Sequence, residues 1–126
     1  MVTFCLGLTA CSKDAEVNAF IAENNAVIKD IAAKVDANPS KAGVDEAQKS
    51  FDSKKDGLKA KWDAIKDARG AQVSADVTKK LNDSVAADMK MLTDVQQKHA
   101  MKLAGDGDAM KNFVKLVQDY ANIVKP

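Results

Sequence analysis

The sequence predicts an all-α fold, an antiparallel up-down bundle of four helices, and three observations lead to this prediction. The 126 residues include only two prolines and six glycines, while alanine and lysine are abundant, which favours helix over sheet. Apolar side chains recur at steps of three and four residues in four segments, as they do along one face of a helix. The breaks between these segments are short, and short connections make successive helices antiparallel.

The first predicted helix covers about residues 14–37. Its inward positions follow heptad spacing, at Val17, Ile21, Asn24, Ile28, Ile31 and Val35. Pro39 ends the helix because the residue before a proline is disfavoured in the α region. Asn24 is the one polar residue in this seam. Either it is buried, where it would fix register or oligomeric state, or it lies at the edge of the seam and reaches water.

The second predicted helix covers about residues 43–69. Its apolar face is thin and includes Phe51 and Trp62. Gly57 in its middle costs about 1 kcal/mol relative to alanine, and Gly70 is the predicted C-terminal cap. The third helix, about residues 74–104, begins after Ser74, a residue type that favours the N-cap position.

Gly105-Asp106-Gly107-Asp108 ends the third helix, and one of its aspartates is expected to cap the fourth, about residues 107–125. The fourth helix has the broadest apolar surface, formed by Met110, Phe113, Leu116, Val117, Tyr120, Ile123 and Val124. Because the second and third helices are the longest, we expect them to form a long hairpin that projects beyond the other two. The alternative is three long helices with a short C-terminal helix packed across them.

The N-terminal residues carry the clearest functional signal. An apolar run over residues 2–8 is followed by the small residues Thr9 and Ala10, then by Cys11 and a polar stretch. Leu8-Thr9-Ala10-Cys11 resembles the lipobox of bacterial lipoproteins, in which small residues precede the cleavage site. The resemblance implies that residues 1–10 are a signal peptide, cleaved between Ala10 and Cys11. No Lys or Arg precedes the apolar run, so we expect the true start codon to lie upstream.

This resemblance also implies compartment and anchoring. Cys11 becomes the first residue of the mature chain and carries the lipid that holds it to a membrane, and residues 11–126 form one helical-bundle domain. Ser12, rather than an aspartate, follows the cysteine, which in enterobacteria favours the periplasmic face of the outer membrane. Cys5 leaves with the signal peptide, so the mature chain keeps no thiol for a disulfide. A protein partner or self-association stays open.

Several functional classes lack their usual residues. Arg69 is the one arginine among nineteen basic residues and the net charge is +1, which disfavours nucleic-acid binding. Ser50, Ser53 and Ser84 have no plausible triad partners, and no glycine-rich phosphate loop occurs. We therefore expect no enzyme and no catalytic residues. The predicted function is a non-catalytic binding or structural role at the cell envelope.

Two alternative functions come from other classes. The first is a periplasmic haem- or metal-binding bundle that uses His99, the only histidine, with a methionine from Met89, Met91, Met101 and Met110. His99 and Met101 point to opposite helix faces, and a lone histidine lacks the clustered ligands of metal sites. We therefore predict no cofactor and no metal, and a His99 packed at the end of the core that donates to a carbonyl or to water.

The second alternative is a chaperone or stress-sensing module that presents the surface of the second and third helices to unfolded clients. Asp106-Gly107-Asp108 also suggests a calcium loop. The run of alternating oxygen ligands that ends in a glutamate is missing, however. We therefore assign these aspartates to helix capping rather than to ion binding.

Overall fold

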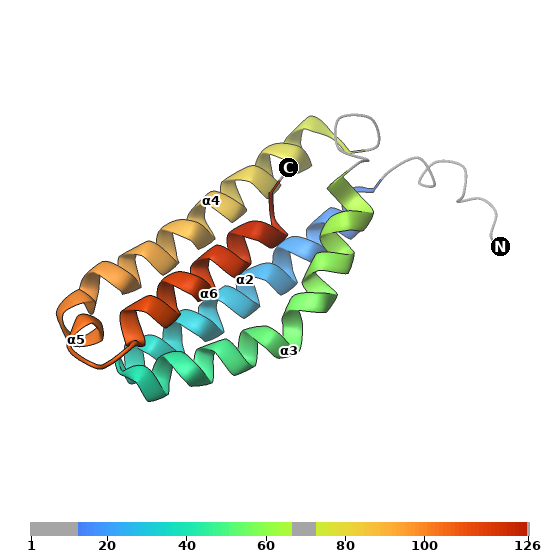
Figure 1. Ribbon diagram of the computed structural model, residues 1–126. Helices are drawn as coiled ribbons and strands as arrows, with labels where there is room; N and C mark the ends of the chain where they lie inside the picture. The colour runs from blue at the N-terminus through green and yellow to red at the C-terminus, as the bar shows by residue number, and fades with distance from the viewer. Residues whose placement is uncertain (1–12, 67–72, 126) are drawn as a thin grey trace.

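The computed structural model describes residues 13–66 and 73–125, which form a bundle of helices (Figure 1). The described elements are α2 (Asp14–Ala37), α3 (Lys41–Lys66), α4 (Ala75–Lys98), α5 (Ala100–Ala104) and α6 (Ala109–Ile123). No strand occurs in this part of the chain, and the predicted all-α bundle is confirmed. The predicted signal peptide, Cys11, Arg69 and Gly70 lie outside the described residues.

The four long helices alternate in direction along the chain. α2 packs beside both α3 and α4, and α6 lies between α3 and α4 on the other side of the bundle (Figure 1). α2 and α4 therefore run one way while α3 and α6 run the other. α6 lies along its neighbours rather than across them (Figure 1).

The prediction that the second and third helices pack together as a projecting hairpin is wrong. α3 and α4 occupy diagonal corners of the bundle and do not pack side by side. The reason lies in α2, whose inward seam is widened by Phe20 and Val27, both buried. This broad apolar arc is covered by two neighbours, so α4 packs on α2 rather than on the thin apolar face of α3.

The core runs the length of the bundle and is apolar at nearly every position. The largest side chains with no exposed surface are Phe20, Phe51, Phe113 and Tyr120, which come from α2, α3 and α6. Full burial of such a side chain stabilises the fold by roughly 1.5–3 kcal/mol. The buried polar or charged residues of the described chain are Asn24 and Asp88.

The starts of α3, α4 and α6 differ in the side chains that accept hydrogen bonds from their backbone N–H groups. Ser74 caps α4 as expected, because its Oγ accepts a hydrogen bond from the backbone N of Val77 (3.3 Å). Asp108 precedes α6 without a side-chain cap bond. Asp106 Oδ2 instead accepts from the backbone N of Lys41 (2.6 Å), the first residue of α3. Asp108 therefore occupies the predicted N-cap position of α6 but makes no side-chain cap bond, and Asp106 instead satisfies the start of α3.

The first turn of α3 requires a glycine where it lies against the end of α2. A Cβ added at Gly43 would lie 1.8 Å from the carbonyl oxygen of Asn38. α3 then changes direction along its length (Figure 1). Ser53 Oγ donates to the carbonyl of Ser50 (2.7 Å) in this helix, and Gly57 follows. Such side-chain bonds to the preceding turn, and glycines, are known causes of helix bending.

Candidate functional site

A buried polar cluster joins the middle of the bundle. Asn24 on α2 has no exposed surface, and its Nδ2 donates to Asp88 Oδ2 on α4 and to the hydroxyl of Tyr120 on α6, each at 2.8 Å. Of the two possibilities that the sequence left open for Asn24, the structure shows the buried one. We call Asn24, Asn25, Ser84, Asp88 and Tyr120 the Asp88 cluster.

Local structure places each member of the cluster. Ser84 and Asp88 lie one helical turn apart on the same face of α4. Asn24 and Asn25 are consecutive on α2 and point about 100° apart, so Asn24 is buried while Asn25 lies at the edge of the core. The amide of Asn25, with its nitrogen turned toward α4, donates to Asp88 Oδ2 and to Ser84 Oγ, each at 2.7 Å. The carboxylate of Asp88 thus accepts bonds from two amides of one helix.

The electrostatics of the cluster are those of a carboxylate without a contacting cation. Asp88 is 3% exposed, and burial raises its pKa to about 6, against the smaller opposing effects of the Asn24 bond and the charge of Lys29. Burial likewise raises the pKa of Tyr120, and the charge of Asp88 adds to that rise. Asn24 Oδ1 accepts no hydrogen bond from the described residues. Because it is unpaired, the cluster is incompletely satisfied.

His99 lies at the break between α4 and α5, where the predicted single helix over 74–104 is interrupted. Its Nε2 lies 2.8 Å from Asp36 Oδ1, and Lys98 Nζ approaches the same oxygen at 2.7 Å. These bonds from Lys98 and His99 lower the pKa of Asp36. The ring is 11% exposed, so it packs near the end of the core as expected. Its partner is a carboxylate, however, rather than a carbonyl or water.

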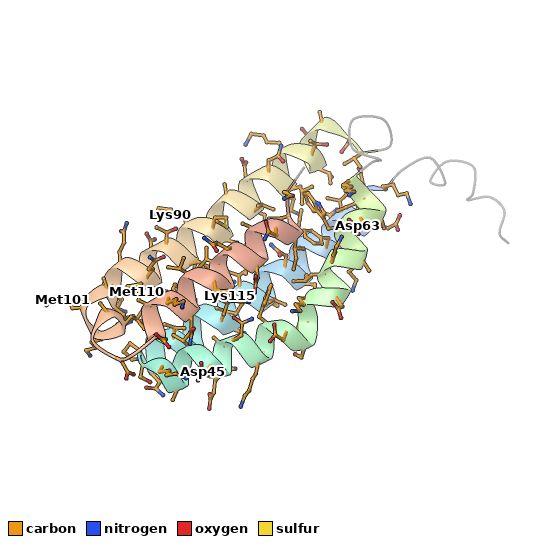
Figure 2. All side chains as sticks on the ribbon, in the orientation of Figure 1. Asp45, Asp63, Lys90, Met101, Met110 and Lys115 are labelled. Carbon is orange, nitrogen blue, oxygen red and sulfur yellow. The ribbon has the colours of Figure 1, made fainter. Side chains whose placement is uncertain are left out.

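The methionines of the haem hypothesis differ in their surroundings. Met101 is 90% exposed at the end of the bundle, in agreement with the predicted opposite faces (Figure 2). Met89, Met91 and Met110 are partly buried against the core. Within residues 13–66 and 73–125, no group of three His, Cys, Asp or Glu side chains could hold a metal ion.

The grooves between neighbouring helices are small. They measure about 190 Å³ between α2 and α3, 200 Å³ between α2 and α4, and 240 Å³ between α3 and α6. Pockets that enclose small molecules usually measure roughly 300–1,000 Å³. A wider hollow of about 520 Å³ lies on α4 beside Val73, and neither it nor the grooves include Asp88.

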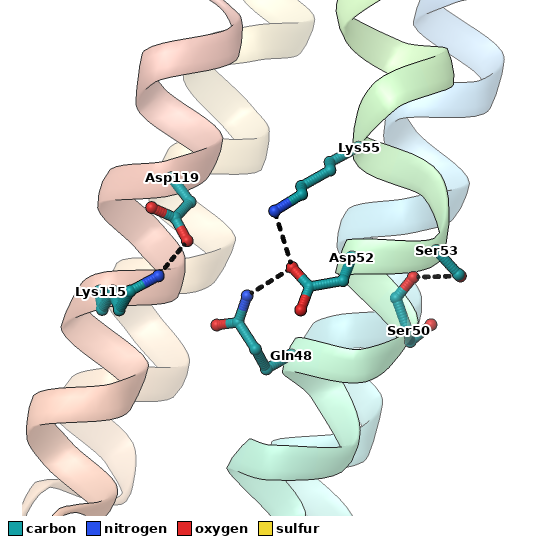
Figure 3. A network of polar contacts seen from close by, with 7 residues as sticks. All are labelled: Gln48, Ser50, Asp52, Ser53, Lys55, Lys115 and Asp119. Carbon is teal, nitrogen blue, oxygen red and sulfur yellow. Dashed lines mark hydrogen bonds and ion pairs between the residues drawn. The ribbon is translucent and has the colours of Figure 1, made fainter.

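Surface charges are mostly neutralised within single helices. Beside the groove between α3 and α6, Asp52 accepts from Gln48 (2.9 Å) and pairs with Lys55 (3.2 Å), while Lys115 pairs with Asp119 (2.8 Å) (Figure 3). These partners are three or four residues apart, the spacing of neighbours on a helix face. α3 therefore presents a solvated face with several ion pairs. Ser50 and Ser53 belong to it, and Ser50 Oγ donates to Asp30 (2.5 Å).

Sequence reasoning missed Asp88, although the signal was present. Leu81, Val85, Asp88 and Leu92 follow one another at steps of four, three and four, which places Asp88 on the inner face of α4. Tyr120 was predicted to be a core residue, which is confirmed, but its hydrogen bond to Asn24 was not foreseen. No short-range pattern indicates which polar residues of three separate helices will meet.

Comparison of the chain with known protein families, characterised proteins and solved structures finds no match. None of the helices in the described ranges is long and apolar enough to cross a lipid bilayer.

Proposed function

We propose that the protein is a lipid-anchored bacterial envelope protein whose helical domain has a binding or structural role without catalysis. The observation that carries the proposal is Leu8-Thr9-Ala10-Cys11, placed directly before a folded domain. α2 begins at Asp14, three positions after Cys11. Acyl chains on Cys11 anchor the mature chain because each buried methylene contributes about 0.8 kcal/mol.

The position of Cys11 gives the anchored domain an orientation. Three extended residues span at most about 10 Å, so the start of α2 lies close to the bilayer in this proposal. α4 begins at the same end of the bundle, and α5 lies at the opposite end (Figure 1). The exposed Met101 on α5 then faces away from the membrane, where a protein partner has access.

The alternative functions receive less support. His99 Nε2, one of the two ring nitrogens that could bind a haem iron or a metal, is bonded to Asp36. A chaperone surface on the second and third helices needs exposed apolar side chains there. In the part of the chain that the structure describes, the large exposed apolar side chain is Met101 on α5, and none lies on α3 or α4.

Acylation is tested by replacing Cys11 with alanine in a gene kept at its native locus with its upstream codons. Wild-type protein should incorporate labelled fatty acid, and its intact mass should correspond to a chain that begins at Cys11 and carries lipid. Cys11→Ala should lose both the label and the cleavage. Cys5→Ala is the matched control, since Cys5 lies in the proposed signal peptide, and it should be labelled and processed normally. A wild-type chain that retains residues 1–10 with an unmodified Cys11 would disprove the proposal.

A further inference from the structure

Asp88 is an acid in a place where a charge is poorly stabilised. It lies in the middle of α4, and it is the buried carboxylate of the described residues. The side chains bonded to it, Asn24 and Asn25, are neutral amides. Burial of an ionised carboxylate is costly unless a cation or several hydrogen bonds compensate it.

The surrounding helices supply little compensation. On α2, the cation that acts on Asp88 is Lys29, an exposed side chain that makes no ion pair with it. On α6, the facing titratable group is the buried hydroxyl of Tyr120. α3 is diagonally opposite to α4, and α5 lies at the end of the bundle. Neither of these two helices contributes a charge that acts on Asp88.

Asn24 can bond to Asp88 in either protonation state. When Asp88 is ionised, the Asn24 nitrogen donates to it, as the structure shows. When Asp88 carries a proton, it becomes a donor, and an amide turned about its last bond presents an oxygen to that donor. The Asn24 oxygen is the acceptor that otherwise lacks a partner. Protonation thus removes the buried charge and keeps the link between α2 and α4.

α4 is the helix on which a change in this cluster would act. It packs less closely on α6 than on α2. Val85 and Met89 on α4 and Val117 on α6 are only partly buried, whereas the apolar residues that α3 directs into the core are fully or nearly fully buried. A polar cluster therefore provides part of the attachment of α4 that apolar packing provides for α3.

We propose that Asn24 and Asp88 form a proton-dependent latch, which holds α4 against α2 and α6 when Asp88 is protonated and loosens α4 when Asp88 is ionised. The raised pKa of Asp88, about 6, places the change between mildly acidic and neutral surroundings. The latch depends only on residues of the bundle and does not require the lipid anchor.

The test is hydrogen exchange of the α4 amides at pH 5 and pH 7.5, corrected for the intrinsic pH dependence of exchange. A carboxyl whose pKa falls from about 6 to its ordinary value on opening makes the opening constant about tenfold larger at the higher pH. We expect this rise in the wild type and none in Asp88→Asn. Asp83→Asn is the matched control, because Asp83 is an exposed aspartate of the same helix, and it should behave as the wild type.

Two results would overturn the latch: a wild-type opening constant that does not change with pH, or the same rise in Asp88→Asn. If Asp88→Asn does not fold, the wild-type protein still decides the question through carbon-13 NMR titration of its carboxyl groups. A midpoint for Asp88 well above the ordinary aspartate range supports the latch. A midpoint at the ordinary value of 3.8 refutes it.

Discussion

α3 and α4 are of similar length and both flank α2, yet they are attached to it differently. The buried positions of α3 are all apolar: Gly43, Val44, Ala47, Phe51, Leu58, Trp62 and Ile65. The buried positions of α4 are fewer and include Asp88. Close apolar packing fixes α3 by shape. α4 depends in addition on hydrogen bonds, whose strength varies with protonation.

The difference originates in one position of α2. Asn24 occupies a seam position that an apolar residue would otherwise fill, and its partners Asp88 and Tyr120 come from two different helices. A buried amide stabilises less than an apolar side chain of similar size, but its bonds have direction. The bonds of Asn24 therefore help to set the register of α4 and α6 against α2.

The largest expected effect on the free energy of unfolding comes from replacing a matched pair of leucines, one on α3 and one on α4. Leu58 on α3 and Leu92 on α4 are both fully buried. Leu58→Ala should lower the free energy of unfolding by about 3–5 kcal/mol, and Leu92→Ala by about 2–3 kcal/mol, because a less closely packed site collapses more readily around the lost atoms. Urea unfolding measures both values. Equal losses would show that the two helices are packed equally well.

The next effect is a maximum of stability at acidic pH. The folded-state pKa of Asp88 is raised from 3.8 to about 6, so its contribution is complete below pH 3.8 and is lost as the pH rises through 6. This loss is on the order of 2–3 kcal/mol. Bonds from Lys34 and Ser50 lower the pKa of Asp30, so the contribution of Asp30 is lost instead as the pH falls through its folded-state pKa.

Urea midpoints between pH 3 and pH 9 should therefore peak at about pH 4 in the wild type. In Asp88→Asn the loss on the alkaline side should disappear, while the loss on the acidic side stays. A wild-type peak above pH 7 would show that Asp88 is ionised in the folded state without cost.

The smallest effect concerns the helix starts. α4 begins with one cap, Ser74, whereas the start of α3 has two acceptors: Ser40 Oγ, which accepts from the backbone N of Gly43 (3.3 Å), and Asp106, which is 65 residues away in sequence. Asp106→Ala should lower the free energy of unfolding by about 1 kcal/mol. Asp108→Ala, next in the same loop and without a side-chain cap bond, should cost less than half of that. The reverse order would restore the original assignment of the cap to the fourth helix.

The sequence predicted what depends on local pattern. The first predicted helix covers the same residues as α2, and Ser74 was recognised as a cap because its role depends on its neighbours in the chain. The diagonal placement of α3 and α4 depends on how side chains from distant segments fit together. Asp106 with Lys41, and His99 with Asp36, are contacts across more than sixty residues that no local spacing indicates.

The sequence indicated one of the two central residues of the candidate site. Asn24 was identified because it interrupts an apolar seam, while Asp88 was not identified as a core residue. The periodicity of α4 places it inward, but an inward position gives no information about its partners. Burial, and with it the raised pKa of Asp88, follows only from the three-dimensional arrangement.

Trp62 is the only tryptophan of the chain, and its indole is nearly buried where three segments converge. Its ring centroid lies 5.4 Å from that of Phe20 on α2, and its Nε1 donates to the carbonyl of Lys125 (2.9 Å), just beyond α6. Its fluorescence is therefore an intrinsic reporter of one end of the bundle. Separation of α2, α3 and the C-terminal residues would shift its emission to longer wavelength without any added label.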